Sequence, residues 1–218
     1  MGEDRRTVTD LIRPPRGSKR WTICLDSERW RHTTAPALRE LGLALGDEVD
    51  TAELEHQLRE VEARYARERA MRLIAYRERS VAEVADRLRQ DGYPGDLADA
   101  VVDDLRTSGL LDDERFAEAR VRSLAVTQGM GRARVRRELT RLGVDDVLAS
   151  RVIDEHVSAV DERERAVVAA TAAVRRGDTP ERLASRLVRR GFTSNDAIRA
   201  ARLALAAADH STDQSVDG

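Results

Sequence analysis

Residues 131–143, GRARVRRELTRLG, end in a pattern that occurs three times along the chain. In each copy a leucine is followed four positions later by a glycine, and an apolar residue stands one helical turn before that leucine. The glycines are Gly92, Gly143 and Gly191, at intervals of about fifty residues. This spacing predicts a repeated helix–turn–helix element in which the glycine directly follows the first helix of the pair.

Helix-start signals support the same repeat. Ser80, Gly131 and Thr179 stand eight positions before the three leucines, where a helix N-cap is expected. Glu83 completes a capping box for Ser80, and Pro180 suits the first helical position. A further helix is expected before each pair, over residues 70–77, 113–127 and 162–175. The sequence therefore predicts three units of three helices each.

The rest of the chain completes an all-α prediction with a small β appendage. Residues 21–34, WTICLDSERWRHTT, contain two β-favouring runs around a polar turn, which predicts a hairpin. A short helix over residues 36–41 and a helix from Ala52, capped by Asp50 or Thr51, follow it. The predicted fold is a tandem array of three three-helix (helix-turn-helix-like) repeats with a small N-terminal β-hairpin appendage. We expect a flexible segment at 1–20, the hairpin and lead-in helices at 21–69, repeats at 70–111, 112–160 and 161–207, and a disordered tail at 208–218.

Residues 110–121, LLDDERFAEARV, contain neighbouring acidic residues that suit either a carboxylate site or a helix start. Acid/base or metal chemistry needs further titratable groups or ligands, and none stands nearby. The helix-start hypothesis explains more residues, with Asp112 as N-cap and Asp113 in the first turn. It also predicts a hydrophobic staple between Leu111 and Phe116. We therefore favour an architectural role for this segment.

Composition excludes several function classes. Aromatic residues make up 3% of the chain and charged residues 36%, so its cores must be built from aliphatic side chains on narrow helical faces. The single cysteine, Cys24, is expected to be a small half-buried strand residue, and the four histidines lack metal-ligand spacing. No phosphate-binding loop or activated-serine motif is present. We expect a cytoplasmic protein with no enzymatic activity, no cofactor and no membrane contact.

The charges are unevenly distributed although the formal net charge is only −2. Residues 91–118 carry nine acidic residues against two arginines, whereas residues 114–141 carry eight arginines against three acidic residues. A small net charge argues against indiscriminate coating of nucleic acid. The banding indicates instead that one part of the surface is basic.

The basic density is greatest on the predicted helix within residues 131–143. Arg134, Arg137 and Arg141 lie opposite a face formed by Val135, Leu139 and Leu142. One interpretation is a solvated helix face in a chain that uses arginine in place of lysine. The other is a contact surface for phosphates or an acidic protein, which the arginine fork binds well. No aromatic ladder for stacking single-stranded bases is present.

The third helix of each unit raises a second hypothesis, which is reading of duplex DNA in the major groove. The third helices of the first two units carry several acidic residues, which phosphates would repel. Only the third unit, with Asn195, Arg199 and Arg202, suits that role. The alternatives to a contact surface in the second unit are therefore a helix-turn-helix transcription factor acting through repeat 3 and a purely structural scaffold.

From residue 70 onward the chain resembles the RecX regulatory proteins of bacteria. The similarity is carried by Arg77, Arg79 and Ser80 before a helix, by the Leu-Asp-Asp-x-x-Phe-Ala block at residues 111–117, and by residues 131–143. The chain departs from the family at Leu142, where family members often have a lysine. The resemblance covers about residues 21–207 and is weaker in the third unit and the N-terminal region.

The resemblance implies a function and partners. RecX proteins consist of three three-helix repeats, lie in the groove of the RecA filament on single-stranded DNA, and inhibit its ATPase, strand-exchange and coprotease activities. It thus implies a monomeric, non-enzymatic modulator of recombination, DNA repair and the SOS response that binds DNA alone only weakly. We take as candidate filament- or DNA-binding residues Arg132, Arg134, Arg136, Arg137, Arg141, Arg122 and Arg79.

Overall fold

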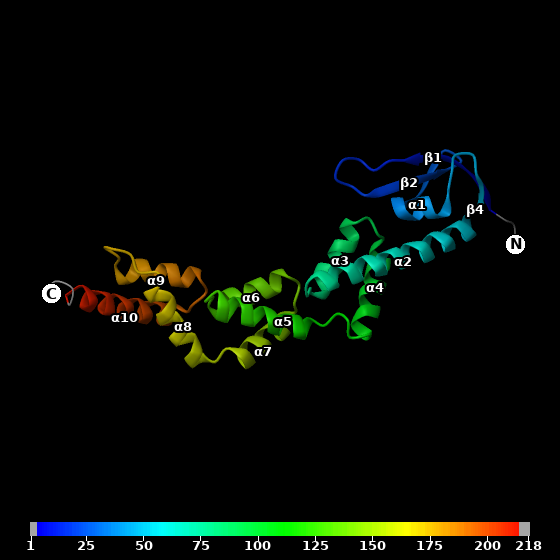
Figure 1. Cartoon of the computed structure of the whole chain (residues 1–218). Helices are drawn as coiled ribbons and strands as arrows, with labels where there is room; N and C mark the ends of the chain where they lie inside the picture. Colours follow the sequence, from blue (N-terminus) through cyan, green and yellow to red (C-terminus); the bar gives the residue numbers. More distant parts are fainter. Residues whose placement is uncertain (1–3, 214–218) are drawn as a thin grey trace. The chain divides into compact units, whose positions relative to one another are not determined.

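The computed structural model describes residues 4–213, which divide between Asp112 and Asp113 into a first and a second compact unit (Figure 1). The elements of the first unit are β1 (Arg5–Ile12), β2 (Arg20–Leu25), β3 (Glu28–Thr34), α1 (Ala35–Leu41), β4 (Glu48–Asp50), α2 (Thr51–Tyr76), α3 (Val81–Gln90) and α4 (Gly95–Thr107). Those of the second are α5 (Asp113–Val121), a π-helical segment η1 (Arg122–Thr127), α6 (Arg132–Arg141), α7 (Asp146–His156), α8 (Ala159–Thr171), α9 (Pro180–Arg189) and α10 (Ser194–Asp213). The predominantly helical fold with a small N-terminal sheet confirms the predicted class.

The three predicted units are confirmed, and each has its own hydrophobic core. The helices α3, α6 and α9 all end in the same turn, in which Gly92, Gly143 and Gly191 adopt φ values of 102°, 83° and 98°. Each glycine N–H donates to the carbonyl three residues earlier, and the next residue donates to the leucine carbonyl five residues earlier. This is a Schellman motif, and it needs a residue that tolerates positive φ.

The N-terminal region differs from the prediction because residues 5–12 form strand β1 rather than a flexible segment. β1 pairs antiparallel with both β2 and β4, which gives a four-stranded sheet in the order β3-β2-β1-β4. Val8 is 1% exposed and packs in the same core as Ile23 and Leu25. The expected hairpin is confirmed as β2 and β3, but it is half of a sheet. Cys24 in β2 is buried at 5% exposure rather than half-buried.

Several helix boundaries also differ from the expected ones. The lead-in helix and the first helix of repeat 1 are one helix, α2, because its sequence contains no glycine or proline to interrupt it. Asp50 caps it by accepting the Glu53 N–H at 2.9 Å. The first helix of repeat 3 runs over Ala159–Thr171 instead of 162–175, since Ser158 and Asp161 form a capping box. The chain expected to be disordered from residue 208 continues α10 to Asp213, and residues 214–218 lie outside the described residues.

The helix start at Asp113 is confirmed, but the predicted staple is wrong. Leu111 belongs to the core of the first three-helix unit, whereas Phe116 belongs to the core of the second. The Leu111 N–H donates to the Leu105 carbonyl at 3.0 Å, so Leu111 closes the end of α4 instead of the start of α5. Two apolar residues five positions apart in the sequence thus belong to different cores.

A buried carboxylate joins the sheet to α2. Glu62 has no exposed side-chain surface, and its oxygens accept from Arg31 Nη2 at 2.7 Å and Thr33 Oγ1 at 2.6 Å. Burial raises the pKa of Glu62, while the Thr33 hydrogen bond and the Arg31 charge oppose that rise. Glu62 therefore links Arg31 and Thr33 of β3 to α2.

Substituting Glu62→Gln should change the pH dependence of stability. A carboxyl whose pKa is raised by folding contributes stability that is complete below its unfolded pKa and is lost as the pH rises through its folded pKa. Relative to Glu62→Gln, the unmodified chain should lose stability as the pH rises above the ordinary value of 4.5. Urea unfolding of both proteins between about pH 4 and pH 8 measures this. The control is Glu60→Gln, whose carboxylate is 68% exposed, and a pH-independent difference for Glu62→Gln would contradict the assignment.

Candidate interface for nucleic acid or protein partners

Helix α6 presents the candidate arginines because its apolar residues are spaced to bury one face. Val135 and Leu139 are fully buried in the core of the second three-helix unit, and Leu142 packs against that core. Gly131 is the N-cap, with φ −74° and ψ 156°. The arginines between these positions consequently point away from the core to different degrees, and their partners differ.

Arg132 is a structural residue. Its guanidinium donates to the Val157 carbonyl and to Asp154 at the end of α7, and its backbone N–H donates to Glu162 Oε1 at 3.0 Å. Glu162 is itself 3% exposed and also accepts from Arg165 at 2.5 Å. Arg132 therefore connects α6 with both α7 and α8 and has little capacity left for a partner.

Arg136 and Arg141 are paired on the surface. Arg136 Nε donates to Asp146 Oδ1 at 2.6 Å, and this hydrogen bond lowers the pKa of Asp146. Arg141 donates to Glu138 Oε2 at 2.9 and 3.1 Å. Exposed ion pairs of this kind contribute little to stability, so a partner can displace them at low cost.

Arg134 and Arg137 have no carboxylate partner among the described side chains of residues 4–158 and 160–208, and Arg137 is exposed while Arg134 is half-buried. Arg122, on η1, is also exposed and unpaired within that range. Arg79 lies in the first unit, where it is 18% exposed and donates from Nε to the Leu73 carbonyl at 3.2 Å. Burial lowers the pKa of Arg79. Arg79 therefore closes the end of α2. The other six candidates lie in the second compact unit.

The structure adds Arg190, which the sequence did not single out. The N–H groups of Gly131 and Ala133 donate to the carbonyls of Arg190 and Gly191 at 2.9 and 3.2 Å, so the start of α6 contacts the turn after α9. Arg190 Nη2 donates to the Gln128 carbonyl at 3.3 Å, and it has no acidic partner within the described part of the chain. The sequence RRG at residues 189–191 shows that two arginines precede Gly191, but only this contact places Arg190 beside α6. We call Arg134, Arg137 and Arg190 the arginine surface.

The third helices are less repulsive to phosphates than their sequences indicated. On α7, Asp146 is held by Arg136 and Asp154 by Arg132, and on α4 Asp99 is held by Arg89. Acidic residues of the band at 91–118 thus pair with arginines outside the basic band, such as Arg67 and Arg89, and the paired arginines of α6 have acidic partners on α6 and α7. On α10, Asn195, Arg199 and Arg202 are exposed, as the DNA-reading hypothesis requires.

Two general features bear on function. Among residues 4–213 no helix is both long and apolar enough to cross a membrane. Among the side chains that the structure describes, no group of three or more His, Cys, Asp or Glu is arranged to hold a metal ion.

Comparison with known proteins identifies the family. The family models for the first and the second three-helix domain of RecX match residues 66–105 and 112–153. Regulatory protein RecX of Geobacillus kaustophilus is 31% identical over 202 residues, which cover 85% of this chain and 72% of that protein. The chain belongs to the RecX family. Regulatory protein RecX of Halorhodospira halophila is 40% identical over 140 residues, covering 62% of this chain and 84% of the relative.

Solved RecX structures agree with the fold. The crystal structure of a regulatory protein RecX matches with a TM-score of 0.59 at 20% identity, covering 88% of this chain and 96% of that one. RecX from Lactobacillus salivarius matches with a TM-score of 0.57 at 19% identity, covering 66% and 96%. At these identities the likeness establishes the shared fold alone.

Proposed function

We propose that this RecX protein binds the RecA filament on single-stranded DNA and inhibits its ATPase, strand-exchange and coprotease activities. It would thereby modulate recombination, DNA repair and the SOS response. The observation that carries the proposal is the arginine surface: three guanidinium groups from two repeats have no acidic partner within the described residues. Such groups are available to phosphates or to carboxylates of a protein partner, and the arginine fork binds both.

The same charges favour weak binding to DNA alone. Most arginines of α6 are neutralised internally, and the net charge of the chain is −2. A protein with few free cations gains little from counterion release on naked DNA. A filament offers protein and phosphate surfaces together, so two modest contacts reinforce each other.

ATP hydrolysis by RecA of the same organism on single-stranded DNA tests the proposal. We expect hydrolysis to fall when the protein is added in amounts below those of RecA. An unrelated DNA-dependent ATPase on the same DNA is the control, because simple masking of DNA would inhibit both enzymes. Unchanged RecA hydrolysis with folded protein would overturn the proposal and favour the transcription-factor alternative through α10, which a nanomolar duplex site at physiological salt would support.

A further inference from the structure

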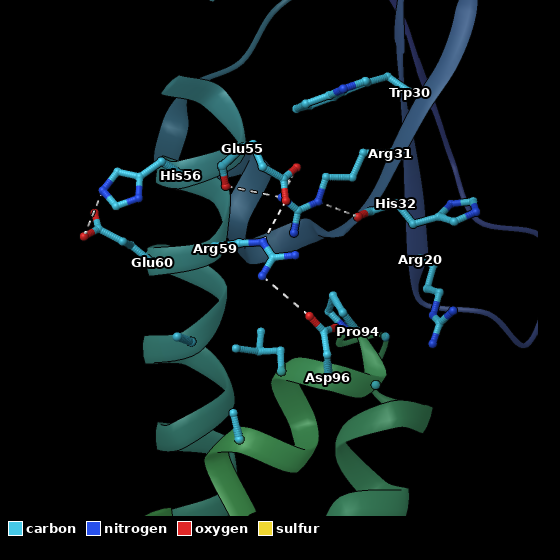
Figure 2. Close-up of a pocket in the computed structure, with 15 residues that line it drawn as sticks. Arg20, Trp30, Arg31, His32, Glu55, His56, Arg59, Glu60, Pro94 and Asp96 are labelled. Atoms are coloured by element: carbon cyan, nitrogen blue, oxygen red, sulfur yellow. Dashed lines mark hydrogen bonds and ion pairs between the residues drawn. The ribbon is translucent and has the colours of Figure 1, made fainter. Parts of the chain in front are cut away.

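A cavity of about 760 Å³ lies within the first compact unit. None of the candidate residues named above lines it. Figure 2 shows its walls: Arg20, Trp30 and His32 come from the strands, His56 and Arg59 from α2, and Pro94 and Asp96 from the start of α4. Ala63, Leu97 and Ala100 add apolar surface. The volume is typical of small-molecule binding sites.

Trp30 lines this cavity at an irregularity in the sheet. β3 is an edge strand, and its pairing with β2 places Arg31 opposite Ile23 and Arg29 opposite Cys24. Trp30 is the extra residue between them, which is the arrangement of a β-bulge. Bulges redirect a side chain and are frequent beside binding sites. Trp30 packs partly against the core formed by the sheet, α1 and α2, and the rest of its half-buried indole lines the cavity, where it can contact a flat ligand.

The charges around the cavity leave one free cation. Glu55 is engaged by Arg31 at 2.7 Å and by Arg59 at 2.8 Å, and Glu60 lies 3.5 Å from His56. The Arg20 guanidinium has no acidic partner among the described side chains of residues 4–158 and 160–208, and the side chain is exposed. A ligand that combines a flat aromatic group with a negative charge therefore fits the unpaired groups, and the carboxylates can accept its N–H groups.

We propose that this cavity receives an unpaired base of single-stranded DNA against Trp30, with a phosphate further along the strand at Arg20. Stacking on one indole and one phosphate contact is a sequence-tolerant mode of binding. The inference extends the proposed function by giving the first unit a DNA contact of its own. It concerns this chain alone, so it stands or falls separately from inhibition of RecA.

Tryptophan fluorescence of a Trp21→Phe protein, in which Trp30 is the remaining indole, tests the proposal. Oligo(dT) of about 12 nucleotides should quench the emission. Gly95→Leu should raise the dissociation constant from quenching about tenfold. A Cβ at Gly95 meets no atom within 4 Å, so the added side chain can occupy the cavity without disturbing the fold. Circular dichroism checks that the fold is retained.

Matched variants separate this site from other contacts. Arg20→Gln should weaken the quenching about threefold, whereas Arg29→Gln, an equal charge change on exposed β3, should leave it unchanged. Labelled oligo(dT) that binds by anisotropy without quenching Trp30 would overturn the proposal, because it would place the DNA elsewhere. Quenching that persists in Gly95→Leu would also overturn it. Equal affinity for free thymidine monophosphate would show a small-ligand site and contradict a strand.

Discussion

Replacing Gly131 by alanine is expected to lower the free energy of unfolding of the second compact unit by about 3 kcal/mol. A Cβ at Gly131 would lie closer than 3.0 Å to the backbone of Gly191 and Phe192, where no flexible side chain can move aside. The backbone at Gly131 has an ordinary negative φ, so the steric overlap is the principal cost. Relief of the overlap would break the hydrogen bonds from Gly131 and Ala133 to the turn after α9.

Urea unfolding followed by circular dichroism measures this effect. Gly95→Ala is the control, because a Cβ there meets nothing and alanine is favoured over glycine in a helix, so a gain of up to about 1 kcal/mol is expected. Hydrogen exchange should show faster exchange at the start of α6 and the end of α9 in Gly131→Ala. A Gly131→Ala protein with the unmodified urea midpoint would contradict the close backbone contact.

Reversing Arg134 and Arg137 to glutamate is expected to raise the concentration needed for half-maximal inhibition of RecA ATP hydrolysis about 100-fold. Neither guanidinium has a carboxylate partner in the described chain, so the substitution removes no internal ion pair and acts on the partner contact. Arg132 would be a poor test, because its bonds to Asp154 and Val157 hold α6 on α7. If an Arg132 variant lost inhibition, the cause could be either a lost contact with the partner or a disturbed packing of α6 on α7.

The matched control reverses Arg29 and Arg182, two exposed arginines without acidic partners in the described residues. It makes the same change in net charge and should leave inhibition within about twofold of the unmodified protein. Unaltered helicity must accompany the loss of inhibition in Arg134→Glu/Arg137→Glu. Inhibition that survives the double reversal would remove the arginine surface from the proposed interface.

Local sequence signals were sufficient for the repeated helices. Ser80 with Glu83 predicts a capping box that the structure contains, and the glycine after each repeat leucine predicts the turn that ends α3, α6 and α9. These features involve residues within about one helical turn of each other, so their pattern is visible in the chain itself. The same holds for the buried faces of Val135 and Leu139.

Longer-range pairing explains what the sequence did not show. β1 was missed because its stability as a strand comes from pairing with β2 and β4 and from burial of Val8, not from a strong local pattern. Leu111 was assigned to the wrong core because a staple and a core contact need the same residue type. The bulge at Trp30 depends on the register of two strands, which the composition of β3 does not specify.

For the candidate interface, too, some features follow from the sequence and others only from the tertiary structure. The sequence alone determined that α6 is basic on the side opposite its buried face, since helical periodicity fixes which residues share a side. Only the tertiary structure decided which of those arginines are free, because Asp146 and Asp154 lie one helix later and neutralise Arg136 and Arg132. It also brought Arg190 to α6 through the contact between Gly131 and the turn after α9. Charge in a sequence is local, whereas its availability to a partner depends on which opposite charges the fold places within reach.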